Sequence, residues 1–64
     1  MTAKQRVLSH DAKATIIRME SAFYKGIEFR VTWDKDGKGN FKIAIGRNSS
    51  EAWVKAINLI ENSK

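Results

Sequence analysis

The chain of 64 residues contains no cysteine, no proline and only one histidine, His10. Without cysteine no disulfide can form, and a single histidine cannot build a His-rich metal site. No apolar run approaches the roughly 20 residues of a membrane span, and the N-terminus lacks the apolar stretch of a signal peptide. These absences predict a cytoplasmic protein that holds no metal ion or cofactor and does not enter a membrane.

Acidic side chains are also scarce, with seven Asp and Glu against twelve Lys and Arg, and the formal net charge is +5. The excess lies in the first two thirds of the chain, since residues 1–26 carry +3, residues 27–48 carry +2 and residues 49–64 are neutral. A basic surplus favours polyanionic partners such as nucleic acid. It can also serve solubility alone, and no continuous run of Lys or Arg decides between the two interpretations.

A chain of this length forms one domain, here taken as residues 1–64, with a modest core. So small a domain has little volume for the concave, preorganised site that catalysis needs, and nothing in the sequence places a serine and a carboxylate around His10. We therefore expect a protein that is not an enzyme. Domains of this size often add disulfides, a metal or a second subunit. Because the first two are disfavoured here, a homodimer stays open as an option.

Two stretches, residues 27–33 and 41–45, have apolar side chains at every second position, which is typical of strands with one face in a core. The Gly, Asp and Asn residues between them favour a hairpin. A two-residue turn at Asp36-Gly37 would move one strand's apolar set to the wrong face, and is rejected. The sequence predicts instead a loop at residues 36–38 and three facing pairs: Trp33 with Phe41, Val31 with Ile43, and Phe29 with Ile45.

The segment before the hairpin favours a helix over residues 9–25. Ser9 is a good N-cap, apolar residues recur at three- and four-residue spacing, and Gly26 suits the position that follows a helix. Residues 1–8 either begin a helix, as the capping-box spacing of Thr2 and Gln5 suggests, or fray.

The alternative for this segment is a strand over residues 14–20, because Thr15-Ile16-Ile17 is β-branched. A tight hairpin at Lys25-Gly26 would set Val31 against Glu20, which argues against that connection. A longer connection would not create this mismatch, and it stays open.

The last element is a helix that Asn48 can cap, with Glu51 in capping-box position and a broad apolar face after it. The predicted order is helix, strand, strand, helix. We therefore expect a small α+β domain of αββα type, with both helices on the apolar face of the hairpin. Trp33 and Trp53 fall in phase with the apolar faces and are expected in the core.

This order is similar to that of double-stranded-RNA-binding domains, which have a helix, three strands and a helix. That family carries paired lysines at the start of its last helix, whereas Ser49-Ser50-Glu51 stand there in this chain. A third strand is not evident either, and small DNA-binding domains with a sheet followed by a helix match equally loosely. The sequence assigns no family.

Basic residues on and beside the hairpin give the main functional indication. A two-stranded ribbon fits the DNA major groove, where Lys and Arg hold phosphates or read guanine edges. We therefore expect a nucleic-acid-binding regulator, with DNA favoured over RNA, although Glu28, Asp34 and Asp36 would repel phosphates. The expected contacts come from the hairpin and the first helix: Arg30, Lys35, Lys38, Lys42, Arg47, Lys13, Arg18 and Lys25.

A protein-interaction module, such as a small inhibitor or adaptor, is the alternative. Ile17 breaks the amphipathic pattern of the expected first helix and falls near Tyr24 on the helical wheel. Either these two residues or an unpaired edge of the hairpin would bind the partner protein.

Overall fold

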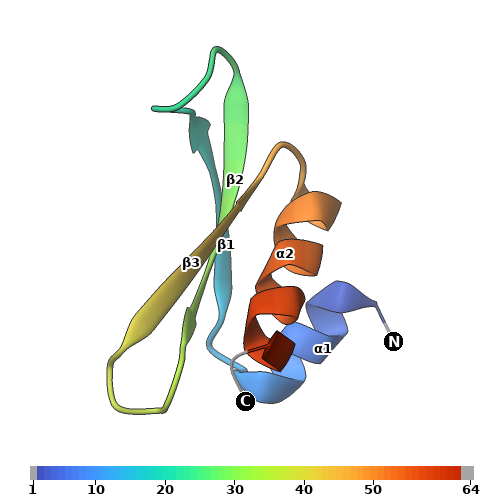
Figure 1. Cartoon of the computed structure of the whole chain (residues 1–64), viewed down its shortest axis with the longest axis vertical. Helices are drawn as coiled ribbons and strands as arrows, with labels where there is room; N and C mark the ends of the chain where they lie inside the picture. Colours follow the sequence, from blue (N-terminus) through green and yellow to red (C-terminus); the bar gives the residue numbers. More distant parts are fainter. Residues whose placement is uncertain (1, 63–64) are drawn as a thin grey trace.

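The computed structural model describes residues 2–62, and its order is helix, three strands, helix (Figure 1). The strands form one antiparallel sheet with β2 in the centre. The elements are α1 Ala3–His10, β1 Thr15–Glu20, β2 Ile27–Asp34, β3 Phe41–Gly46 and α2 Ser49–Asn62. The predicted α+β class is confirmed, but the sheet has one strand more than the predicted hairpin. Among residues 2–62, no helix has the length and apolar character that crossing a membrane requires.

The predicted helix over residues 9–25 is wrong. Ser9 lies within α1, whose N-cap is Thr2 and whose capping box with Gln5 is complete. The chain then leaves the helix and forms β1, which pairs along its whole length with β2. A six-residue connection, residues 21–26, joins the two strands, as in the longer alternative. The short β-branched run at residues 15–17 fits the spacing of a helix and that of a strand, and pairing with β2 stabilises the strand.

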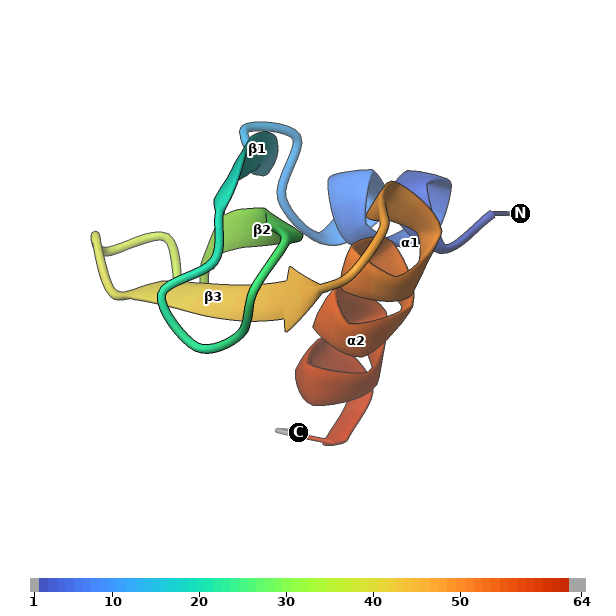
Figure 2. The same cartoon turned by 90° about the horizontal axis from the view of Figure 1, so that it is seen from above.

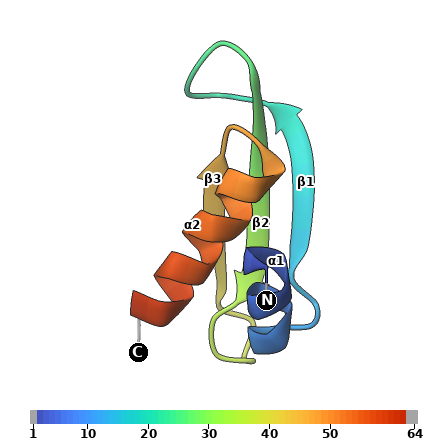
Figure 3. The same cartoon turned by 90° about the vertical axis from the view of Figure 1, so that its right-hand side faces the viewer.

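The predicted hairpin register is wrong by one residue. Trp33 faces Lys42 and Val31 faces Ala44, so the large apolar residues of β3 lie on the face opposite to Trp33. The reason is the position of α2, which packs directly on β3 and on β2 (Figure 3). Beneath a helix that close, the buried positions of β3 are small. Ala44 and Gly46 take that face together with the exposed Lys42, while Phe41, Ile43 and Ile45 take the other.

The core lies between the sheet and the helices, and α1 packs chiefly on α2 (Figure 2). Both tryptophans are buried, with 3% of Trp33 and 6% of Trp53 exposed, which confirms that expectation. Asn48 caps α2, since its side-chain oxygen accepts a hydrogen bond of 2.8 Å from the Glu51 N–H. The remaining core side chains come from all the elements that meet here: Val7, Val31, Ala44, Ala52, Ala56, Ile57 and Ile60.

Gly46 sets how closely α2 approaches the sheet. A Cβ at this position would lie 2.4 Å from the backbone nitrogen of Ala52 and 2.8 Å from its Cα. Neither atom can move without displacing the first turn of α2, because both belong to the helix backbone. The end of β3 and the start of α2 are therefore in contact through a residue that has no side chain.

We predict that Gly46→Ala destabilises the protein by about 1–3 kcal/mol, the usual cost of overpacking a closely packed contact. The measurement is urea unfolding followed by tryptophan fluorescence. Ser50→Ala, at an exposed position in the same turn of α2, is the control and should change stability by less than about 0.5 kcal/mol. A Gly46→Ala protein as stable as the wild type would show that this contact does not limit the approach of α2.

Candidate nucleic-acid interface

The connection between β2 and β3 is a tight loop closed by a hydrogen bond of 2.9 Å from the Lys35 N–H to the Asn40 carbonyl. Inside it, Gly37 and Gly39 adopt left-handed backbone conformations, with φ of 74° and 88°. Glycine enters this region without the steric penalty that a Cβ would bring. The two-residue Asp36-Gly37 turn is absent, in agreement with its rejection on sequence grounds.

The acidic side chains of this loop point into it. Asp34 accepts hydrogen bonds from the Asp36, Gly37 and Gly39 N–H groups, at 3.2, 2.9 and 3.0 Å. Asp36 accepts one from the Asn40 side-chain amide at 2.6 Å and one from the Lys38 N–H at 2.8 Å. The Asn40 amide, followed by the Lys38 N–H, lowers the pKa of Asp36. Both carboxylates therefore hold the loop backbone, and Asp36 does so at an exposed position.

Asp11 joins this loop to the end of α1. One oxygen of its carboxylate accepts a hydrogen bond of 2.8 Å from the Asp34 N–H, and the other accepts one of 2.9 Å from the Lys13 N–H. The Asp34 N–H and then the Lys13 N–H lower the pKa of Asp11, because both bonds favour the charged form. Asp11 thereby fixes Lys13 beside the hairpin loop.

We call Lys13, Lys35, Lys38 and Lys42 the tip cluster. Lys13 lies two positions after Asp11, Lys35 and Lys38 belong to the loop, and Lys42 is the second residue of β3. The ion pairs of residues 2–62 are Arg6–Glu61, Arg30–Glu28 and Lys55–Glu51, so none of them engages a lysine of the tip cluster. Four cations thus surround one end of the sheet without a carboxylate partner.

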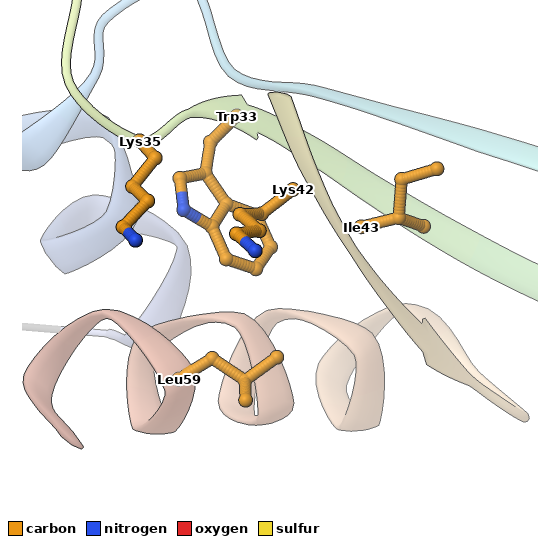
Figure 4. A pocket seen from close by; sticks show the side chains of 5 residues that line it. All are labelled: Trp33, Lys35, Lys42, Ile43 and Leu59. Carbon is orange, nitrogen blue, oxygen red and sulfur yellow. The ribbon is translucent and has the colours of Figure 1, made fainter. Parts of the chain in front are cut away.

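The predicted register put Lys42 on the polar face of the hairpin, away from the core. In the structure Lys42 does not lie there. It lies opposite Trp33 on the side of the sheet that faces α2. Figure 4 shows the Lys35 and Lys42 side chains beside the Trp33 ring. Together with Ile43 and Leu59 they line a shallow cavity of about 210 Å³. The two lysines therefore stand at the edge of the core, at the same end of the sheet as the loop.

The other predicted cations are not part of this cluster. Arg18 pairs with Phe29 in the sheet, and Lys25 lies in the connection between β1 and β2, at the end of the sheet away from the loop. The Arg47 guanidinium stacks over the Tyr24 ring, 5.5 Å from its centroid. The strands are about 20–25 Å long, so these three cations and the tip cluster form two groups at opposite ends of the sheet.

Arg30 is the least available of the predicted contacts. It lies in the middle of β2, forms an ion pair with Glu28 and exposes 24% of its side chain. Glu28 is fully buried, and its pKa is lowered, first by the Arg30 hydrogen bond. Because this guanidinium already compensates a buried carboxylate, a phosphate would have to compete for it.

We call the face of the sheet opposite Trp33 the open face, because its outer strands expose large side chains, although Glu28 in its central row is fully buried. Alternation of the strands places on it Ile17 and Met19 of β1, and Phe41 and Ile43 of β3, on either side of the polar row of β2. The exposed fractions of these four side chains are 52%, 37%, 65% and 53%. Sequence reasoning missed the β3 residues, because the predicted register put them in the core.

The Ile17/Tyr24 surface expected for a partner protein does not match this geometry. Ile17 is exposed on the open face, whereas Tyr24 lies half-buried in the connection between β1 and β2. Its hydroxyl donates a hydrogen bond of 2.8 Å to the Ile27 carbonyl, and its ring lies under Arg47. Tyr24 therefore holds the connection in place.

Comparison of the chain with protein-family models, with curated proteins and with solved structures gives no match. Within residues 2–62, no group of three or more His, Cys, Asp or Glu side chains is placed to hold a metal ion. The functional argument therefore depends on the tip cluster and the open face.

We predict that the protein loses stability as the pH falls below about 4. The pKa values of Asp11 and Glu28 are lower in the folded protein than the ordinary values of 3.8 and 4.5 for these side chains. Their contribution is therefore complete above those values, and it is lost as the pH falls through the folded pKa values. Urea unfolding between pH 7 and pH 2 measures this loss.

Asp11→Asn should lower stability at pH 7 and flatten the acid dependence, because an amide offers one acceptor oxygen where the carboxylate uses two. The matched control is Glu61→Gln, which removes the same charge at an exposed position. An acid profile unchanged by Asp11→Asn would contradict the bridging role of this carboxylate.

Proposed function

We propose that the protein is a small, non-enzymatic nucleic-acid-binding regulator that grips the phosphate backbone with the tip cluster. The observation that carries this proposal is the orientation of charge at the hairpin loop. Asp34 and Asp36 are turned into the loop by backbone hydrogen bonds, and the lysines around them have no ion pair within residues 2–62. The loop N–H groups thus hold these carboxylates in place, whereas the lysine side chains are free to reach a phosphate.

The dimensions of the chain suit a duplex. The β2–β3 hairpin ends in a narrow loop, and a two-stranded ribbon is of a size that the DNA major groove, about 12 Å wide, admits. In the arrangement that we propose, α2 lies on the Trp33 side of the sheet, and the end of α1 lies beside the loop, where Asp11 binds the Asp34 N–H. Lys35 and Lys38 enter between the two phosphate backbones, with Lys13 and Lys42 behind them. DNA is favoured over RNA, because the A-form major groove is too narrow for such a ribbon.

Arg18, Lys25 and Arg47 form a second and weaker contribution. They lie at the far end of the sheet, and the longest dimension of the molecule is 33 Å. This length corresponds to about ten nucleotide steps along one strand of a duplex. These cations therefore increase the general attraction to DNA without joining the contacts made at the tip.

We predict that Lys35→Gln/Lys38→Gln weakens binding to a short fluorescein-labelled DNA duplex and reduces its salt dependence. Each phosphate contact contributes about 0.9 to the slope of log K against log salt, so losing two should lower the slope by nearly 2. Fluorescence anisotropy between about 50 and 200 mM salt measures both effects.

The matched control is Lys4→Gln/Lys55→Gln, which removes the same charge from exposed positions on the two helices. It should leave the slope nearly unchanged. Equal effects of the two double variants would mean that net charge, and not the tip cluster, determines binding. Absence of binding by the wild type at the lowest salt would refute the proposal.

A protein-interaction module is the second candidate, and the exposed apolar side chains of the open face favour it. Four large apolar residues on one face of a sheet are more than the scattered surface apolars of an ordinary monomer. Such a module would tolerate Lys35→Gln/Lys38→Gln and would fail when Ile17 is replaced by Asp.

A further inference from the structure

The apolar side chains of the open face form two strips, on β1 and on β3, with the polar row of β2 between them. Large side chains such as these present roughly 150–250 Å² each when free. At their exposed fractions, Ile17, Met19, Phe41 and Ile43 together leave roughly 400 Å² of apolar surface in contact with water. The largest apolar patch on a typical monomer has about this size and is often functional.

This face carries little charge, although the chain has a net charge of +5. Glu28 and Arg30 neutralise one another, and Asp34 is bound to loop N–H groups. Lysines without an ion pair lie at its rim, where Lys13 lines a hollow with Phe41, and Lys35 and Lys42 line the Trp33 cavity with Ile43. The large exposed side chains of the face itself are apolar, so it suits a partner surface that is also apolar, such as the same face of another copy.

We propose that two copies of this chain associate through their open faces, as a twofold sheet-on-sheet dimer. Sheets that pack face to face lie about 10 Å apart, with their strands within about 30° of each other. A twofold axis in the interface then sets β2 over β2 and the outer strands over outer strands. The apolar residues of β1 and β3 therefore meet apolar residues of the second copy, and the polar row meets its own equivalent.

Burial of the polar row adds little cost. Glu28 is already fully buried, and Arg30 exposes only 24% of its side chain while paired with it. Most of the dehydration of this ion pair has therefore occurred in the monomer. Thr32, which is half-buried, has a hydroxyl that can bond across the interface to its equivalent.

The area defines the strength of the association. Two apolar patches of roughly 400 Å² each, together with the polar rows, give a total buried surface of roughly 1,000 Å² for the two copies. This area is at the lower limit of specific interfaces. The dimer is therefore of the weak class and forms at high micromolar protein concentration. It adds an apolar layer to a small domain that has no disulfide. The tip cluster borders this face, since Lys13 and Phe41 line one hollow, so dimerisation places two tip clusters on one particle.

Sedimentation velocity of the whole chain, from low micromolar to near-millimolar concentration, tests this proposal. The wild type should pass from monomer to dimer, and higher salt should favour the dimer, because screening reduces repulsion between two chains of charge +5. Ile17→Thr/Ile43→Thr keeps β-branched residues in both strands and should weaken dimerisation at least tenfold. Val54→Thr/Leu59→Thr, at exposed positions of α2, should leave it unchanged.

A wild type that stays monomeric throughout this range overturns the proposal. It is also overturned if the control variant weakens the dimer as much as Ile17→Thr/Ile43→Thr, because that result indicates pairing through α2. If neither variant weakens the dimer, the copies pair through a strand edge and the proposal is overturned as well. Amide chemical shifts of the wild type on dilution give a test that does not depend on the folding of a variant. The largest changes should fall on Ile17, Thr32 and Ile43, and changes confined to the helices refute the dimer.

Discussion

The close approach of α2 to the end of β3 is the contact on which the rest of the structure depends. A Cβ at Gly46 would come within 2.4–2.9 Å of backbone atoms of Glu51 and Ala52, so the strand and helix touch without an intervening side chain. The cap at Asn48 begins the helix within two residues of the strand, and this leaves the connection almost no freedom. The axis of α2 relative to the sheet is therefore determined at its first turn.

This single contact also decides which residues of β3 face the core. Beside this helix β3 presents the small residues Ala44 and Gly46, and the register places Val31 opposite Ala44 and Trp33 opposite the flexible Lys42. The large side chains Phe41 and Ile43 are left on the open face. The exposed apolar patch is thus a consequence of how the core is packed. It also explains why a pairing rule based only on gathering large apolar residues selects the wrong register.

Much of the fold could be predicted from short-range patterns, because those patterns act locally. The capping residues of α2, the two alternating runs of the hairpin and the burial of Trp33 and Trp53 all follow from neighbours a few positions apart. The strand β1 could not be assigned in this way, since residues 15–20 satisfy helical and strand periodicity equally well over so short a length. Only pairing with β2, a contact across the six-residue connection, resolves the choice.

The same division applies to the candidate sites. The lysines of the hairpin loop were identified correctly as residues of the loop, because turn chemistry is local. The bond from the Asp34 N–H to Asp11 spans 23 positions, and no spacing rule connects the two residues. Yet that bond adds Lys13 to the tip cluster and gives Asp11 a role that its place near the end of a helix does not suggest.

Charge and apolar surface are separated in this molecule, and the separation is physically consistent. The lysines without ion pairs gather where loops leave the sheet, since long cationic side chains need water around their ammonium groups. The open face keeps its only cation, Arg30, bound to a buried carboxylate. A phosphate backbone and a second apolar sheet would therefore not compete for the same atoms. In the two contacts that we propose, salt would act in opposite directions, weakening the one made by lysines and favouring the one made by neutral side chains.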